Sequence, residues 1–93
     1  MPITRINDFQ AREGQGDALR QEIESFIPVI EAAPGCRSCR VMLGEDDPDR
    51  IVVIEEWESV PDHRAAAETI PADALARAKA LLVAPPRGGY FRG

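Results

Sequence analysis

The 93-residue chain has few of the side chains that build most metal, redox and nucleotide sites. It contains one histidine and two cysteines, Cys36 and Cys39, whereas a structural zinc site takes four such ligands. The cysteine pair follows Pro34-Gly35 and precedes a strand-like run, so it lacks the helix N-terminus that lowers the thiol pKa in redox motifs. No glycine-rich phosphate loop or serine-histidine-aspartate signature is present. We therefore expect packed or incidental thiols, no metal and no cofactor.

Basic clusters and long apolar segments are also missing. The net charge is −5, and the ten arginines and one lysine are scattered along the chain. No apolar run approaches the roughly 20 residues that span a bilayer, and the N-terminus lacks the basic-then-apolar layout of a signal peptide. The sequence therefore predicts binding to neither nucleic acid nor membrane. It favours a cytoplasmic protein with one small domain over residues 1–93.

What the chain does have is a run of four β-branched residues, Ile-Val-Val-Ile at 51–54, that leads through two glutamates to the single tryptophan, Trp57. Successive side chains of a strand alternate between its faces, so this run places two apolar side chains on each face. A chain of this length buries only about 60–65% of its unfolded surface. Because little material remains to cover both faces, we expect a partner chain to cover the second.

The remaining pattern predicts the element order β-α-β-β-α-β, with the second helical region in two pieces. Predicted strands cover residues 3–9, 39–43, 51–58 and 89–92, and the acidic turn at 44–50, with Asp46, Asp47 and Asp49, is expected to be solvated. Three helices are predicted. The first covers residues 19–32, is capped by Asp17 or a neighbour, and is kinked or divided at Pro28. The second is a short helix through residues 64–68 that is capped by Ser59 or Asp62, and the third begins at Pro71.

This order is typical of the α+β ferredoxin-like sandwich, in which helices cover one face of a four-stranded antiparallel sheet. The other face stays open. In this chain it would expose more apolar surface than monomers usually do. The sequence therefore predicts a homodimer with its two sheets face to face.

Five short motifs stand out along the chain: Pro34-Gly35-Cys36, the Asp47-Pro48 turn, the run at 51–59, His63-Arg64, and the closing Pro85-Pro86 with Gly89-Tyr90-Phe91. Together they resemble the antibiotic biosynthesis monooxygenase family, over nearly the whole chain and in the same order. The resemblance implies a dimeric α+β barrel with a cavity between helices and sheet in each protomer. The family's activities include cofactor-independent oxygenation of electron-rich phenols and quinone precursors, oxidative haem breakdown, and isomerisation or degradation of small signalling molecules.

The resemblance also assigns expectations to individual positions. Trp57 matches the tryptophan that ends the family's third strand. Some quinone-forming members have an asparagine four residues earlier on the same strand face, where this chain has Val53. Asn7 matches the first-strand asparagine of the haem-degrading branch, but Ala65 and Leu75 replace the tryptophan and the haem-ligating histidine of that branch. Haem breakdown is therefore disfavoured.

Cofactor-free oxygenation needs an aromatic wall, a base and a few hydrogen-bond donors around an acidic phenol or enol, with water excluded. The candidates are His63, Trp57 and Asn7 as catalytic residues and Arg5, Glu55 and Tyr90 as substrate-binding residues.

Each candidate also has a structural interpretation. Trp57 either packs in the core or lines a pocket, and Glu55 either pairs with an arginine such as Arg40 or faces a cavity. The only histidine has an ordinary pKa near neutrality, and it is either the base or an exposed residue. Arg5 and Asn7 are either pocket groups or dimer contacts. Tyr90 is either a site residue or a packing residue of an edge strand.

Two functions are consistent with these residues. The first is a small cofactor-independent monooxygenase that acts on an aromatic, polyphenolic or quinol-like compound. The alternative is a dimeric barrel without oxygenase activity that binds, isomerises or degrades a small apolar metabolite.

Overall fold

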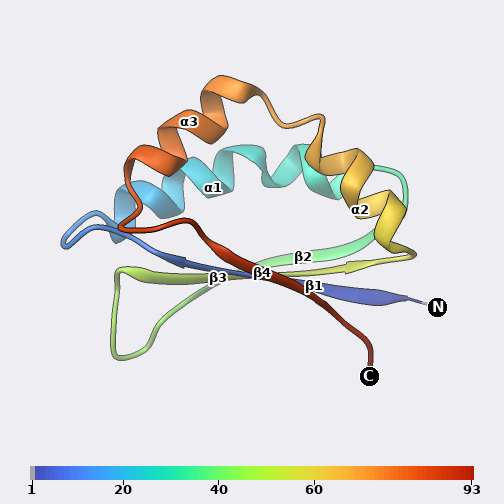
Figure 1. Ribbon diagram of the computed structural model, residues 1–93, viewed down its shortest axis with the longest axis horizontal. Coiled ribbons are helices and arrows are strands. Elements are labelled where there is room, and N and C mark those ends of the chain that lie inside the picture. The colour runs from blue at the N-terminus through green and yellow to red at the C-terminus, as the bar shows by residue number, and fades with distance from the viewer. Residues whose placement is uncertain (1) are drawn as a thin grey trace.

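The structure, a computed structural model, describes residues 2–93. Its elements follow the order β1 (Ile3–Gln10), α1 (Gly16–Glu31), β2 (Cys36–Leu43), β3 (Arg50–Trp57), α2 (Val60–Ala67), α3 (Ala72–Ala80) and β4 (Arg87–Phe91). The strands form one antiparallel sheet in the order β2-β3-β1-β4. All three helices lie on the same side of this sheet, and its other side is uncovered (Figure 1). The predicted ferredoxin-like α+β fold is confirmed.

Strands β1 and β3 match their predicted bounds to within one residue, whereas β2 and β4 begin two or three residues earlier than predicted because backbone pairing extends them. Strand β2 begins at Cys36, and a register shift between Cys36 and Ser38 accommodates its first residues. Strand β4 begins at Arg87, which pairs with Asp8 of β1. The first residues of β4 have little strand propensity of their own, so the pairing with β1 determines their conformation.

The core lies between α1 and the helix-facing side of β3. Leu19 and Ile23 of α1 and Ile51 and Trp57 of β3 are fully buried there. Helix α1 runs as one helix through the exposed Pro28 to Glu31, so its last turns are not a separate piece. The apolar spacing that predicted this helix therefore also identified the face that it buries.

The start of α1 is held by a residue from a distant turn. Asp49 accepts hydrogen bonds from the backbone N–H groups of Gly14 and Gly16, at 3.0 and 2.9 Å. The N–H of Gly16, in the first turn of α1, has no partner within the helix. Asp17, which was predicted to cap the helix together with its neighbours as alternatives, instead pairs with Arg20, and Gln15 at the N-cap makes no side-chain cap hydrogen bond. A side chain at Gly16 would meet the backbone of the Asp49 turn. The prediction of a merely solvated turn is therefore wrong for Asp49.

The second helical region follows its predicted caps. The side chain of Ser59 accepts a hydrogen bond from the backbone N–H of Asp62 and caps α2, which confirms the first of the two candidates. Pro71 stands at the N-cap of α3. None of the helices within residues 2–93 is long and apolar enough to cross a membrane.

Candidate functional site

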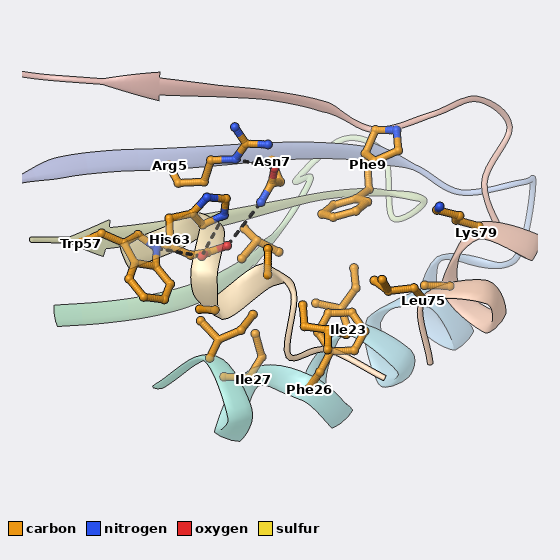
Figure 2. Close-up of a pocket in the computed structure, with 18 of the residues that line it drawn as sticks. Arg5, Asn7, Phe9, Ile23, Phe26, Ile27, Trp57, His63, Leu75 and Lys79 are labelled. Carbon is orange, nitrogen blue, oxygen red and sulfur yellow. Dashed lines mark hydrogen bonds and ion pairs between the residues drawn. The ribbon is translucent and has the colours of Figure 1, made fainter. Parts of the chain in front are cut away.

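A cavity of about 220 Å³ lies between the helices and the helix-facing side of the sheet. Most of its wall is apolar and comes from all three helices and from β1 and β3: Phe9, Ile23, Phe26, Ile27, Ile30, Val53, Ala66, Ile70, Leu75, Ala78 and Leu82 contribute. The polar groups of the lining, except Lys79, gather at one end. Figure 2 shows Arg5, Asn7, Trp57 and His63 there, and Phe9, Leu75 and Lys79 at the opposite end. The cavity therefore combines a long apolar wall with one polar end.

Glu55 is the centre of the polar end. Its side chain points toward the helices and is only 3% exposed. Its Oε1 accepts a hydrogen bond from Trp57 Nε1 at 2.9 Å, and its Oε2 accepts one from Asn7 Nδ2 at 3.3 Å. Arg40 pairs with Ile54 in the sheet and therefore lies on the other face. Of the two interpretations of Glu55, the arginine pair with Arg40 is wrong, and the carboxylate faces the cavity.

The amide of Asn7 connects Glu55 to a cationic side chain. Arg5 Nε donates a hydrogen bond to Asn7 Oδ1 at 3.0 Å, while Asn7 Nδ2 donates to the glutamate. These two bonds fix the orientation of the amide, because its oxygen accepts and its nitrogen donates. One N–H of the amide remains for a bound molecule.

His63 enters the cavity from α2 and lies between an aromatic wall and a hydroxyl group. Its ring meets Trp57 edge-on, with ring centroids 5.6 Å apart. Its Nδ1 lies 2.7 Å from the hydroxyl of Tyr90, and its Nε2 lies 3.9 Å from Glu55 Oε1. The imidazole is therefore held at Nδ1, and Nε2 is on the side of the glutamate.

Burial shifts the titration of both ionisable groups toward their neutral forms. Removal from water raises the pKa of Glu55 above its ordinary value of 4.5, although the hydrogen bond from Trp57, the charge of Arg5 and the hydrogen bond from Asn7 oppose this shift. Burial also lowers the pKa of His63 below 6.5, helped by the nearby charges of Arg5 and Arg64. A weakly acidic carboxyl next to a neutral imidazole is typical of sites that move protons near neutral pH.

Five of the six candidate residues line the cavity: Arg5, Asn7, Glu55, Trp57 and His63. Trp57 is fully buried and also lines the cavity. Its side chain therefore packs in the core and forms part of the pocket wall at the same time. Tyr90 does not line the cavity. Its hydroxyl contacts His63 Nδ1, and Arg5 Cζ lies 4.7 Å from the centroid of its ring.

Two residues at the site were missed in the sequence. Lys79 of α3 lines the cavity at the end opposite to Trp57 and His63 (Figure 2), and Gly88 of β4 lies against the side chains of Arg5 and Asn7. The only signal for Lys79 was that it is the single lysine of the chain. Gly88 had no signal, because its role depends on which residues β4 pairs with.

The two cysteines lie near this site without forming a reactive pair. Both are free and half-buried. Burial and the negative charge of Glu55 raise the pKa of Cys39 to about 12, which opposes formation of a nucleophilic thiolate. Within residues 2–93, no group of three or more histidine, cysteine, aspartate or glutamate side chains is arranged to hold a metal ion.

The fold is that of an α+β protein of the ferredoxin-like class, with a cavity between sheet and helices. Residues 2–78 match the sequence model of the antibiotic biosynthesis monooxygenase family. The chain belongs to this family. A comparison with the curated proteins gave no significant match.

Solved structures with the same fold extend over nearly the full length of the chain. Rv0793 from Mycobacterium tuberculosis is 24% identical, with 100% of this chain and 95% of that chain covered and a TM-score of 0.79. PA3566 from Pseudomonas aeruginosa is 22% identical, with coverages of 97% and 91% and a TM-score of 0.84. SnoaB from Streptomyces nogalater, described as a cofactor-independent oxygenase, is 18% identical, with coverages of 99% and 92% and a TM-score of 0.84.

Proposed function

We propose that the protein is a cofactor-independent monooxygenase that acts on a small aromatic phenol, polyphenol or quinol-like compound. The observation that carries the proposal is the pair of a partly buried His63 and a buried Glu55 at the polar end of a largely apolar cavity. Membership of the monooxygenase family supports it, as does the likeness in fold to SnoaB. The pair supplies a proton acceptor next to a surface on which an aromatic ring can pack.

The first step of the proposed reaction is removal of a proton from the substrate. His63 is the base in this proposal because it lines the cavity and its lowered pKa keeps the imidazole neutral near pH 7. The tautomer that donates from Nδ1 to the Tyr90 oxygen leaves the lone pair of Nε2 free. Once Nε2 has taken the proton, the imidazolium lies 3.9 Å from the Glu55 carboxylate, and this charge stabilises it.

The second requirement is stabilisation of the substrate anion while it passes an electron to oxygen. Arg5 lines the cavity and supplies a positive charge, and Asn7 supplies its remaining N–H group. Asn7 is the direct partner of Val53 across the sheet. An amide from β1 therefore lies beside the position where some quinone-forming members of the family carry an asparagine on the third strand.

The cavity limits the size of the substrate. A cavity of about 150 Å³ is enough to hold benzene, so about 220 Å³ has room for a somewhat larger ring system. The apolar wall excludes water from the reacting centre, which strengthens the electrostatic interactions inside. These features favour a compact aromatic substrate with one acidic hydroxyl directed at His63.

The proposal includes a second copy of the chain on the open side of the sheet. Ile6, Val52 and Ile54 lie side by side on that face, and Met42 beside them is 45% exposed. The ion pair between Asp8 and Arg50 and the side chains of Arg40 and Glu56 supply polar groups around this apolar centre. An apolar centre with a polar surround is typical of protein interfaces, and two identical faces can pack against each other in a symmetric homodimer.

The alternative function is a dimeric barrel without oxygenase activity that binds or rearranges a small apolar metabolite. The apolar side chain of Val53 and the largely apolar wall favour it. The alternative predicts binding of aromatic ligands without consumption of oxygen, so one assay separates the two functions.

The test is oxygen uptake by the purified, metal-free protein with a panel of anthrones, naphthols and quinols. The proposal predicts uptake above the buffer rate for at least one compound, and a loss of about 100-fold or more in kcat/KM for His63→Ala, the usual contribution of a general base. Ligand binding without uptake across the whole panel would establish the alternative. Unchanged uptake by His63→Ala would remove His63 from the mechanism.

A further inference from the structure

We infer that Gly88 of β4 is a positioning residue, because its missing side chain leaves the space in which Arg5 and Asn7 lie against Glu55. This inference deepens the proposed function by assigning control of the Glu55 carboxyl to the edge strand. It concerns the ionisation of one group and can be measured without substrate. It can therefore fail or hold independently of the oxygenase activity.

A side chain at Gly88 would displace Arg5 and Asn7 from their present positions. Gly88 pairs with Asn7 in the sheet. A Cβ on Gly88 would stand 2.7 Å from Asn7 Oδ1 and 2.8 Å from Arg5 Cζ, and closer still to Arg5 Nη2. Backbone conformation does not require the glycine, because Gly88 does not have a positive φ. The requirement comes only from the two polar side chains that occupy the space.

Strand β4 supports Arg5 at two successive positions on one face. The guanidinium lies over Gly88 and also over the ring of Tyr90, whose centroid is 4.7 Å from Arg5 Cζ. A cation over an aromatic face is stabilised by the ring quadrupole. This arrangement places Arg5 Nε at 3.0 Å from Asn7 Oδ1, and it thereby turns the amide N–H group toward Glu55.

The consequence is a chain of polar contacts from β4 to the buried carboxyl. The charged and titratable groups that face Glu55 are Arg5 from β1, Cys36 and Cys39 from β2 and His63 from α2, while α1 faces it with apolar side chains. Among them, Arg5 is the one permanent cation. Arg5 and Asn7 oppose the desolvation that raises the pKa of this carboxyl. Displacement of the pair should therefore raise that pKa further.

The fluorescence of Trp57 provides a direct readout. Trp57 is the only tryptophan of the chain, and its Nε1 donates to Glu55 Oε1 at 2.9 Å. Its emission as a function of pH therefore reports the ionisation of the carboxyl, and the transition that disappears in Glu55→Gln belongs to that group. We expect Gly88→Ala to move this transition to higher pH.

Gly89→Ala is the matched control. Gly89 is the next residue of β4 and points to the open face, where an added Cβ would meet only the ring edge of Phe91, at 3.2 Å. It should leave the transition where it is in the wild type. An equal shift in both variants, or no shift in Gly88→Ala, would overturn the inference. So would a wild-type titration without any transition that Glu55→Gln removes.

A second variant keeps the test decisive should Gly88→Ala fold poorly. Arg5→Met removes the guanidinium and keeps most of the length of the side chain, and it should also move the transition to higher pH. In the Arg5→Met background, Gly88→Ala should add little, because coupled positions act non-additively. A full additional shift in the double variant, or no shift in Arg5→Met, would contradict the assignment.

Discussion

The two faces of β3 use the same kinds of residue for different purposes. Ile51 and Glu55 point toward the helices, where the isoleucine is fully buried and the carboxyl is held by hydrogen bonds in the cavity. Ile54 and Glu56 point to the open side, where the isoleucine is half-buried and the glutamate is exposed. One face builds the core and the site, and in the proposed dimer the other face builds the interface. Strand alternation alone separates these roles.

In so small a protein, residue type does not reveal a residue's role. Two neighbouring glutamates differ because one of them meets Asn7 and Trp57, and two isoleucines three residues apart differ because helices cover only one side (Figure 1). Matched substitutions on the two faces therefore test whether the division between them is real.

The largest effect is expected from a charge in the centre of the open face. Ile54→Lys would place an ammonium group in the proposed interface of both copies, and burying such a group costs several kcal/mol. At about 1.4 kcal/mol per factor of ten, the dissociation constant of the dimer should rise by roughly a thousandfold or more. Val29→Lys, at an exposed position of α1, is the control and should leave association unchanged. Sedimentation over a range of concentrations measures both, and a monomeric wild type at micromolar concentration would refute the dimer.

The next largest effect is expected from substitutions of the two isoleucines of β3, Ile51 and Ile54. Ile51→Ala removes fully buried methyl groups and should lower the free energy of unfolding by about 2–5 kcal/mol at every protein concentration. Ile54→Ala should instead act through association, so its change in Tm should depend on concentration. Thermal unfolding at two widely separated concentrations distinguishes these cases. The same concentration-independent loss in both variants would contradict the division between the faces.

A smaller effect is expected from loss of the hydroxyl that holds His63. Tyr90→Phe keeps the ring beneath Arg5 but removes the group 2.7 Å from His63 Nδ1. With the imidazole less well oriented, kcat should fall by about tenfold. The Tm should fall by at most about 4–8 °C, since one such hydrogen bond contributes about 1 kcal/mol. Steady-state oxygen uptake measures the change. A loss seen only in KM would assign Tyr90 to substrate binding instead.

The smallest effect is a change in the pH dependence of stability. The folded protein raises the pKa of Glu55 above its ordinary 4.5. It therefore holds more protons than the unfolded chain between these two pKa values, and the contribution of Glu55 to stability is lost as pH rises through this window. Glu55→Gln should remove that part of the slope, whereas Glu56→Gln should not. Denaturant unfolding from pH 4 to pH 8 gives the slopes, and identical slopes for both variants would refute the buried carboxyl.

Much of the fold could be predicted from local sequence features. The apolar spacing of α1, the cap at Ser59 and the alternation in β3 are signals carried by residues close together in the chain, and each produced the expected element. The cap of α1 could not be predicted this way, because Asp49 reaches it from a turn 33 residues away.

The site was predicted in composition but not in its contacts. Asn7 and Glu55 were both candidates from the sequence, but the hydrogen bond between them follows from strand register. Register also excludes the interpretation in which Glu55 pairs with Arg40, since a shift of one residue moves a side chain to the other face. The space at Gly88 depends on the pairing of β1 with β4, which no local pattern indicates.

The sharpest test of a site on the helix-facing side of β3 compares the two neighbouring glutamates in catalysis. The measurement is kcat/KM for oxygen uptake, with the best substrate of the panel, in Glu55→Gln and in Glu56→Gln. If the chemistry lies on that side, the first variant should lose about tenfold or more, because the imidazolium of His63 loses its neighbouring charge, and the second should match the wild type. Equal activities in the two variants would contradict a catalytic site built around Glu55.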